Sequence, residues 1–261
     1  MMRGVALLIL LPILASAQIR VSKLEIIPGQ TFTIQEGDIL VVDTLIMRDS
    51  SAIQLNRKLA DNFIHAKVFI AGNGVRILGH GAKGQRGIDG RRGTTPTGPC
   101  ADGVQGRGGT GGSHGENGNN LSIYTTDFNL QGSLTVDLAG GDGGDGGDGG
   151  PGGGGGQGTR VCVGGNGGNG GNGGTGGNGG NGGNFNINCK TCPNLRLWLG
   201  EKMVIRNFGG FAGLGGEAGR GGSAGLGVNG DNSKDGKNGG RGKKGTDGEA
   251  GKPGAVNFDH F

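Results

Sequence analysis

The sequence predicts a mostly β base, either solenoid-like or a small sandwich, that carries three hairpins of polyglycine II helices and contains almost no α-helix. Two observations support this fold class. Glycine accounts for 69 of the 261 residues and recurs with a period of three, which is the turn of a polyproline II type of helix. Between the glycine tracts the chain consists of short apolar runs separated by turn residues, a pattern typical of β-strands.

The expected β base is assembled from four stretches of ordinary composition, 18–79, 119–138, 184–208 and 255–261. Most of the phenylalanines, the single tryptophan and the single tyrosine lie in these stretches, so the apolar core is expected there. Short strands spaced by turns favour a solenoid or a sandwich. The runs expected as strands are Phe32 to Ile34, Ile39 to Val42, Leu45 to Met47, Val68 to Ile70, Val75 to Leu78, Leu121 to Tyr124, Leu134 to Leu138, Phe185 to Asn188, Leu195 to Leu199 and Met203 to Phe208.

Three glycine-rich excursions, at 80–118, 139–183 and 209–254, interrupt this base. In each of them the period of three breaks once, at TTPTGPCAD, TRVCV and NGDNSKD, and then resumes. We expect each excursion to run out, turn at the break and run back, which gives three hairpins and six arms. An arm of about 20 residues at ~3.1 Å per residue would extend for roughly 60 Å.

The second excursion has the highest glycine content. Its returning part, GGNGGNGGNGGTGGNGGNGGN at 164–184, has two glycines in each triplet, whereas the other excursions mostly have one. Bare backbone N–H and C=O groups need hydrogen-bond partners, and glycine lets a neighbouring backbone approach closely. We therefore expect the second hairpin to lie in the middle, flanked by the other two.

Residues 1–17 have the organisation of a signal peptide. Arg3 supplies a positive charge, Val5 to Leu14 an apolar stretch, and Ala15 to Ala17 a small-residue cleavage site. The apolar stretch is too short for the ~20 residues that span a bilayer. The mature chain would begin near Gln18 and be secreted or held at the cell surface, with an uncleaved anchor as the alternative. No later segment is expected to span a membrane.

The four cysteines allow three pairings. Cys100 lies midway along the first excursion and Cys162 midway along the second, so both are expected at hairpin tips, whereas Cys189 and Cys192 lie in the base. Because bridged Cα atoms lie within about 7 Å of each other, this placement selects Cys100 with Cys162 and Cys189 with Cys192. A redox motif or half a zinc site is the alternative for the CKTC sequence, but a lone C-x-x-C is weak support for either.

No constellation in the sequence predicts catalysis, and we expect no enzyme, no cofactor and no metal site. Asp142, Asp145 and Asp148 share one edge of a threefold helix, about 9 Å apart, whereas a Ca²⁺–O distance is only ~2.3–2.6 Å. We interpret them as a solvated edge. The histidines are scattered, and the net charge of +4 comes from basic residues that alternate with acidic ones. No nucleic-acid partner is therefore expected.

The repeated GGX and GXX triplets resemble the polyglycine II bundles of springtail antifreeze proteins and of phage tail-fibre adhesins with a polyglycine sandwich. They are also similar to those of glycine-rich, collagen-like secreted proteins of bacteria. The resemblance is confined to the glycine tracts and rests on periodicity. It implies a rigid bundle that presents a flat face or a set of tip loops.

Two alternatives to a bundle within one chain remain. A collagen-like trimer would explain the glycine period, but it requires long unbroken repeats and about 15–20% proline or more, and proline accounts for only 7 of the 261 residues. Disorder is the other alternative, because glycine loses more conformational freedom on ordering than any other residue. A monomer is favoured over a trimer.

The function expected from these features is that of a non-enzymatic secreted or cell-surface protein that presents tip loops to an extracellular or surface ligand. Loops on a rigid scaffold are common sites of recognition. Ice binding and a collagen-like extracellular role are the alternatives. The tip-loop residues expected to bind are Thr94, Thr95, Thr97, Asp102, Arg160, Asn229, Asp231 and Lys234.

Overall fold

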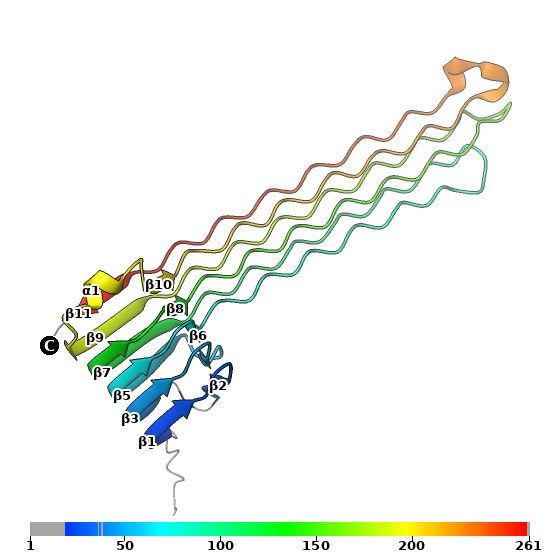
Figure 1. Cartoon of the computed structure of the whole chain (residues 1–261). Coiled ribbons are helices and arrows are strands. Elements are labelled where there is room, and N and C mark those ends of the chain that lie inside the picture. Colours follow the sequence, from blue (N-terminus) through cyan, green and yellow to red (C-terminus); the bar gives the residue numbers. More distant parts are fainter. Residues whose placement is uncertain (1–18, 36, 38, 260–261) are drawn as a thin grey trace, which may run out of the picture.

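The computed structural model describes residues 19–35, 37 and 39–259, so the signal peptide expected at 1–17 lies outside the described residues. The base consists of two parallel β-sheets (Figure 1), which confirms the mostly β prediction. From edge to edge, the six-stranded sheet contains β1 (Ile19–Ile26), β3 (Ile39–Met47), β5 (Asp61–Ala71), β7 (Asn120–Leu130), β9 (Phe185–Thr191) and β11 (Val256–Asp259). The five-stranded sheet contains β10 (Met203–Arg206), β8 (Leu134–Asp137), β6 (Val75–Leu78), β4 (Ala52–Gln54) and β2 (Thr31–Thr33).

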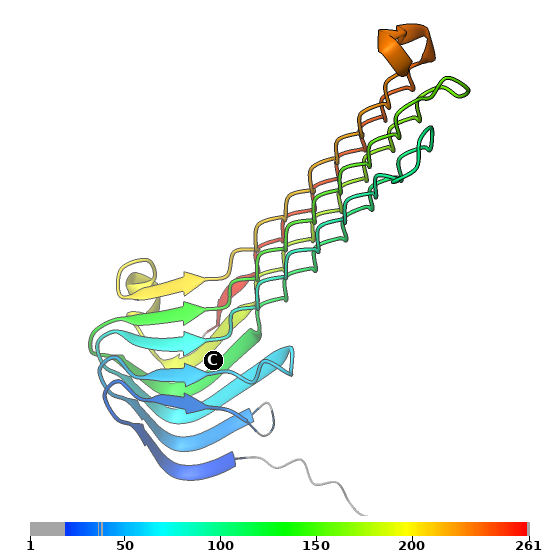
Figure 2. The ribbon, with the colours of Figure 1, turned by 90° about the vertical axis from the view of Figure 1, so that its right-hand side faces the viewer.

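Successive strands alternate between the two sheets, so that each coil of the chain adds one strand to each sheet (Figure 2). All pairings between these strands are parallel, and the longest one joins β5 to β7 from Asp61↔Asn120 to Ala71↔Leu130. Stacked parallel coils form a β-solenoid, whereas the sheets of a sandwich are antiparallel. Of the two bases that the sequence allows, the structure therefore has the solenoid.

The core lies between the two sheets, because alternate side chains of each strand point inward. An aliphatic column crosses the six-stranded sheet from Leu40 through Ile64 and Ile123 to Ile187, each paired in register with the next. All four side chains are at most 1% exposed. Burying a side chain of this size stabilises a fold by about 1.5–3 kcal/mol, and the column therefore ties consecutive coils together.

The glycine excursions extend the same corner of three successive coils. They leave the base after β6, β8 and β10 and return to β7, β9 and β11. Figures 1 and 2 show them as three long out-and-back paths that lie side by side and project away from the base. Apart from two short 3₁₀ turns at the third tip, η1 (Val228–Gly230) and η2 (Asn232–Lys234), they carry no helix or strand among the described residues.

One expected strand is wrong. The run Leu195 to Leu199 was expected as β, but it begins with a single helical turn, α1 (Leu195–Trp198). Leucine and arginine are good helix formers, and the turn follows the tight loop closed by Cys189 and Cys192. Leu195 is fully buried, so this turn covers part of the core. Among the described residues, no helix has the length and apolar character needed to cross a membrane.

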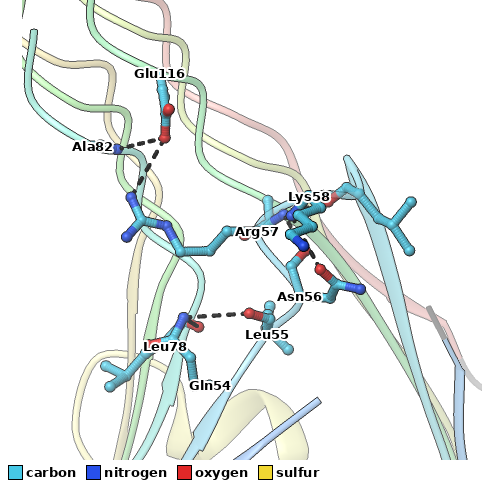
Figure 3. A network of polar contacts seen from close by, with 10 residues as sticks. Gln54, Leu55, Asn56, Arg57, Lys58, Leu78, Ala82 and Glu116 are labelled. Atoms are coloured by element: carbon cyan, nitrogen blue, oxygen red, sulfur yellow. Dashed lines mark hydrogen bonds and ion pairs between the residues drawn. The ribbon is translucent and has the colours of Figure 1, made fainter. Parts of the chain in front are cut away.

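A polar network joins the base to the first excursion (Figure 3). The carboxylate of Glu116 accepts a hydrogen bond from the guanidinium of Arg57 over 3.4 Å and another from the backbone N–H of Ala82 over 3.3 Å. Beside it, the side-chain amide of the buried Asn119 donates to the carbonyl of Asn56 over 3.2 Å. These contacts hold both halves of the first excursion at the point where they leave the base.

Candidate functional site: the ends of the glycine excursions

The part of the molecule farthest from the base consists of the three turns of the excursions (Figure 2). Their position depends on how the straight parts of the excursions are held. We call the parts that leave the base outgoing runs, at 81–93, 140–158 and 209–226. We call the parts that come back returning runs, at 103–118, 164–183 and 236–254.

Backbone hydrogen bonds join neighbouring runs at every third residue. Within the second excursion the N–H of Gly171 donates to the carbonyl of Gly150, and Gly174, one triplet further, donates to Gly147, both over 2.8 Å. The N–H of Gly170, the preceding residue, donates to the carbonyl of Gly240 in the third excursion over 2.9 Å. The two glycines of one triplet thus bond to two different neighbours.

The second excursion lies between the other two and bonds to both. Gly109 of the first excursion donates to the carbonyl of Asn172 over 2.8 Å, and Gly219 of the third donates to the carbonyl of Gly171 over 2.9 Å. No comparable bond joins the first excursion directly to the third among the described residues. The excursion with two glycines per triplet therefore has the most backbone neighbours.

Close approach explains why glycine is needed at these positions. A Cβ atom at Gly171 would overlap the carbonyl oxygen of Arg107, and one at Gly170 would overlap that of Gly219. At Gly154, on the third position of its triplet, the nearest atom to a Cβ would be the Ser223 Oγ at 3.5 Å, an ordinary contact. Glycine is thus required where runs face one another and is dispensable on the outer edge.

Side-chain oxygens accept many of the N–H groups at the third position of the triplets. The Oδ1 of Asn172 accepts a hydrogen bond from the backbone N–H of Lys243 over 2.8 Å. The same contact is made to the segment after the third tip by Asn166, Asn169, Asn178, Asn181 and Asn184. The asparagine of the GGN triplet is therefore part of the contact between two excursions.

The three aspartates expected on a solvated edge have a similar role. The Oδ1 atoms of Asp142, Asp145 and Asp148 accept hydrogen bonds from backbone N–H groups of the third outgoing run, over 2.7 to 2.9 Å. The prediction of a purely solvated edge is therefore incomplete, because one oxygen of each carboxylate takes part in the contact between runs.

A covalent bond joins two of the tips. Cys100 at the first tip is bonded to Cys162 at the second, with their Cα atoms 6.1 Å apart. Cys189 and Cys192 form the other pair, with Cα atoms 5.9 Å apart at the end of β9. Both pairs are those that the positions of the cysteines select, and they leave no free cysteine in the part of the chain that the structure describes.

Three of the expected binding residues make hydrogen bonds within the bundle at the first tip. The carbonyl of Thr94 accepts from the N–H of Val104 over 3.0 Å. The Oγ1 of Thr95 accepts from the N–H of Gly154 over 2.9 Å, and the Oδ1 of Asp102 accepts from that of Asn166 over 2.6 Å. These hydroxyl and carboxylate groups are thus already engaged within the bundle.

The other expected binding residues lie on the surface of the tips, although not together. Thr97 and Arg160 are exposed on the first and second tips. At the third tip Asn229 is exposed and left-handed, with φ 56°. Lys234 is partly buried there, and its carbonyl accepts from the N–H of Gly164 over 2.8 Å.

Asp231 orders the third tip through its carboxylate. Its Oδ1 accepts from both the hydroxyl and the backbone N–H of Ser233. These bonds to Ser233 favour the ionised form and lower the pKa of Asp231. On the first outgoing run, the N–H of Asp148 and then the Arg86 guanidinium lower the pKa of Asp89 in the same way. Both carboxylates are therefore anions that contribute to the structure.

Sequence reasoning missed the apolar side chains of the tips. Val161 is 93% exposed at the second tip, Val163 beside it is 55% exposed, and Leu226 at the third tip is 59% exposed. A shallow hollow of about 380 Å³ lies between the first and second excursions near their tips, lined by Thr95, Pro96, Thr97, Gly98, Pro99, Gly155, Gly156 and Gln157. The TRVCV break contained the signal for these exposed side chains, because it places two valines in a turn that has no core to bury them.

This surface combines apolar side chains, one exposed guanidinium and backbone polar groups, which suits recognition. The described residues contain no group of three or more His, Cys, Asp or Glu side chains that could hold a metal ion. Compared with known proteins, the chain matches no family model, no curated protein and no solved structure. Its function has to be argued from its own geometry.

Proposed function

We propose that the glycine runs are six polyglycine II helices packed within one chain, and that the protein is a non-enzymatic binding protein of the cell surface or the extracellular space. The observation that carries this proposal is the hydrogen-bond ladder with a period of three, which matches the three residues per turn of this helix. No described glycine of the runs has a positive φ, and this also agrees with the left-handed extended helix.

A bundle of this kind is a rigid spacer. Each central run bonds to several neighbours through its backbone, for example through Gly170 and Gly171 at once, so bending one run would break bonds to the others. Because all these bonds form within one chain, the bundle needs no second or third chain, which favours a monomer over a collagen-like trimer. The tips are then held at a fixed distance from the base.

The disulfide between Cys100 and Cys162 supports an extracellular location, because disulfides persist in oxidising compartments. It joins two tips and so fixes the relative position of two loops that could contact a ligand. Binding loops held on a rigid scaffold lose little conformational freedom when the ligand binds. We therefore assign recognition to the tip surface around Arg160 and Val161.

The proposal is tested with the full chain on arrays of extracellular and cell-surface proteins. The double variant Arg160→Glu, Val161→Asp changes two exposed side chains of the second tip, and Lys252→Glu, an exposed residue near the base, is the matched control. We expect the tip variant to lose the binding of the unmodified chain and the control to keep it. Equal binding by the tip variant and the unmodified chain would contradict a tip-centred function.

One observation favours ice binding as a second candidate. Gly108 and Gly111 have no side chain, and with their exposed neighbours Asn172 and Thr175 they form an uncharged stretch on the returning runs. Flat surfaces of small residues are the feature implied by the resemblance to the springtail proteins. Thermal hysteresis of the purified chain tests this candidate, and a freezing point equal to the melting point would eliminate it.

A further inference from the structure

The three outgoing runs form one face of the bundle, which we call the outgoing face. Neighbouring runs are joined by bonds such as Gly84 N–H to the Asp142 carbonyl over 2.7 Å and Gly143 N–H to the Phe211 carbonyl over 2.8 Å. Side chains at every third residue therefore line up in three columns. One column contains Lys83, Arg86, Asp89 and Arg92, the next contains Asp142, Asp145 and Asp148, and the third contains Phe208, Phe211, Leu214 and Glu217.

A groove of about 500 Å³ lies at the foot of this face, where the runs leave the base. It is far from the tips, since it includes the ends of β8 and β10. Its lining residues are Arg57, His80, Gly81, Ala82, Lys83, Asp137, Ala139, Gly140, Gly141, Asp142, Arg206, Phe208 and Phe211.

One wall of the groove is aromatic and exposed. Phe208 is 54% exposed and Phe211 is 75% exposed, although large apolar side chains are usually buried. The backbone around them is fixed, since the Phe211 N–H donates to the Asp142 Oδ1 over 2.9 Å and the Phe208 carbonyl accepts from Gly140 over 3.0 Å. Phe208 and Phe211 are three residues apart, which is one turn of the run. Because their backbone is held in place, the two rings cannot both become buried in the core.

The rest of the lining offers both hydrogen-bond donors and acceptors. Lys83 and Arg206 form no ion pair with any residue in the described part of the chain. Asp137 is the register neighbour of Arg206, and the Asp137 and Asp142 carboxylates each accept one backbone hydrogen bond in the structure. Because an ionised carboxylate has about four acceptor sites, both of them retain capacity for a ligand.

We propose that this groove binds a neutral carbohydrate chain. A sugar ring has an apolar C–H face, which fits against a phenyl ring, and a rim of hydroxyls, each of which both donates and accepts. The hydroxyls would donate to Asp137 and Asp142 and accept from Lys83 and Arg206.

The balance of charges argues for a neutral ligand. Two carboxylates oppose the free Lys83 and Arg206, and Arg57 is already paired with Glu116 over 3.4 Å, so an anionic chain gains little. A folded protein partner needs a total buried area of about 1,200–2,000 Å², which is far more than the exposed area of this groove. This inference goes beyond the proposed function, because it concerns the end of the bundle opposite to the tips.

The experiment is affinity electrophoresis of the full chain through gels that contain a soluble neutral β-glucan, glucomannan or starch, with an anionic polyuronate gel for comparison. We expect at least one neutral polysaccharide to retard the chain. Phe211→Ala and Arg206→Gln are each expected to weaken that binding by roughly tenfold, since each removes one wall contact. The tip variant Arg160→Glu, Val161→Asp should be retarded like the unmodified chain, which separates this inference from the proposed function.

Matched controls come from the same molecule. Ile88→Ala removes a side chain that is also 75% exposed but lies on a different edge, and Arg220→Gln removes an exposed guanidinium away from the groove. Both controls should keep the retardation. Failure of every neutral polysaccharide to retard the chain, retardation by the polyuronate alone, or retardation of Phe211→Ala equal to that of Ile88→Ala would overturn the proposal.

Discussion

The side-chain oxygen of Asn172 accepts a hydrogen bond from the backbone N–H of Lys243, 2.8 Å away in the next excursion. The contact bridges residues 71 positions apart in the sequence, and five more asparagines of the same column repeat it with the same separation. The asparagine side chain thus provides a hydrogen-bond acceptor for one backbone N–H of the neighbouring triplet. The glycines of the tract have no side chain that could accept this bond.

Asn172→Ala is expected to destabilise the chain by about 1 kcal/mol, because it leaves the Lys243 N–H without its protein partner. The measurement is the free energy of unfolding from thermal melts followed by circular dichroism. Gln105→Ala is the control, since Gln105 is exposed on the neighbouring run and its side chain makes no hydrogen bond to the described residues. Equal effects of the two substitutions would rule out a structural role for the asparagine column.

Gly171→Ala is expected to destabilise the chain by about 1–3 kcal/mol or more, as overpacking of a close interface does. The added Cβ would overlap the Arg107 carbonyl oxygen. Gly154→Ala, where the nearest atom is 3.5 Å away, should be neutral or stabilising by about 0.4–1 kcal/mol, because alanine reduces the freedom of the unfolded chain. A pair of chemical denaturation curves measures both, and equal effects would mean that the runs are not in close contact.

The two disulfides should differ in their contribution to stability. Cys100 and Cys162 are 62 positions apart, whereas Cys189 and Cys192 are 3 apart. In the chain-entropy model the longer loop contributes about 4 kcal/mol and the short one much less. We expect the double serine variant of Cys100 and Cys162 to lower the midpoint of unfolding more than that of Cys189 and Cys192, and the reverse order would contradict the tip assignment.

Stability should decrease in acid because of Asp89 and Asp231. The pKa of each is lowered in the folded chain from the ordinary value of 3.8. A lowered folded-state pKa stabilises the fold above the pKa of the unfolded chain, and this contribution is lost as the pH falls through the lowered value. The loss is therefore expected below about pH 4. Unfolding free energies between pH 7 and pH 2 should fall less steeply in Asp89→Asn than in the unmodified chain.

The general plan of the molecule can be predicted because periodicity is a local property. The switch from apolar runs to GGX triplets indicates where the base ends, and the triplet breaks around Cys100 and Cys162 indicate the turns. The pairing of the cysteines follows from their equal depth along the excursions. None of this requires knowledge of long-range packing.

The details that depend on neighbouring runs could not be predicted. The hydrogen bond from Phe211 to Asp142 joins residues 69 positions apart, and a solvated edge was the simpler interpretation of an aspartate column. Leu195 and its neighbours alternate like a strand, but tertiary contacts select one helical turn. Thr95 and Asp102 occupy tip positions typical of binding residues, yet their oxygens hold adjacent runs together.

Hydrogen–deuterium exchange of individual glycine amides tests the central claim most directly, namely that the glycine runs form an ordered bundle bonded through the backbone within one chain. The Gly171 N–H, which donates to the Gly150 carbonyl, should exchange many orders of magnitude more slowly than the Gly98 N–H at the first tip, which has no backbone acceptor among the described residues. Slow exchange should recur along 164–183 in a monomeric sample. Exchange of Gly171 as fast as that of Gly98 would contradict the bundle.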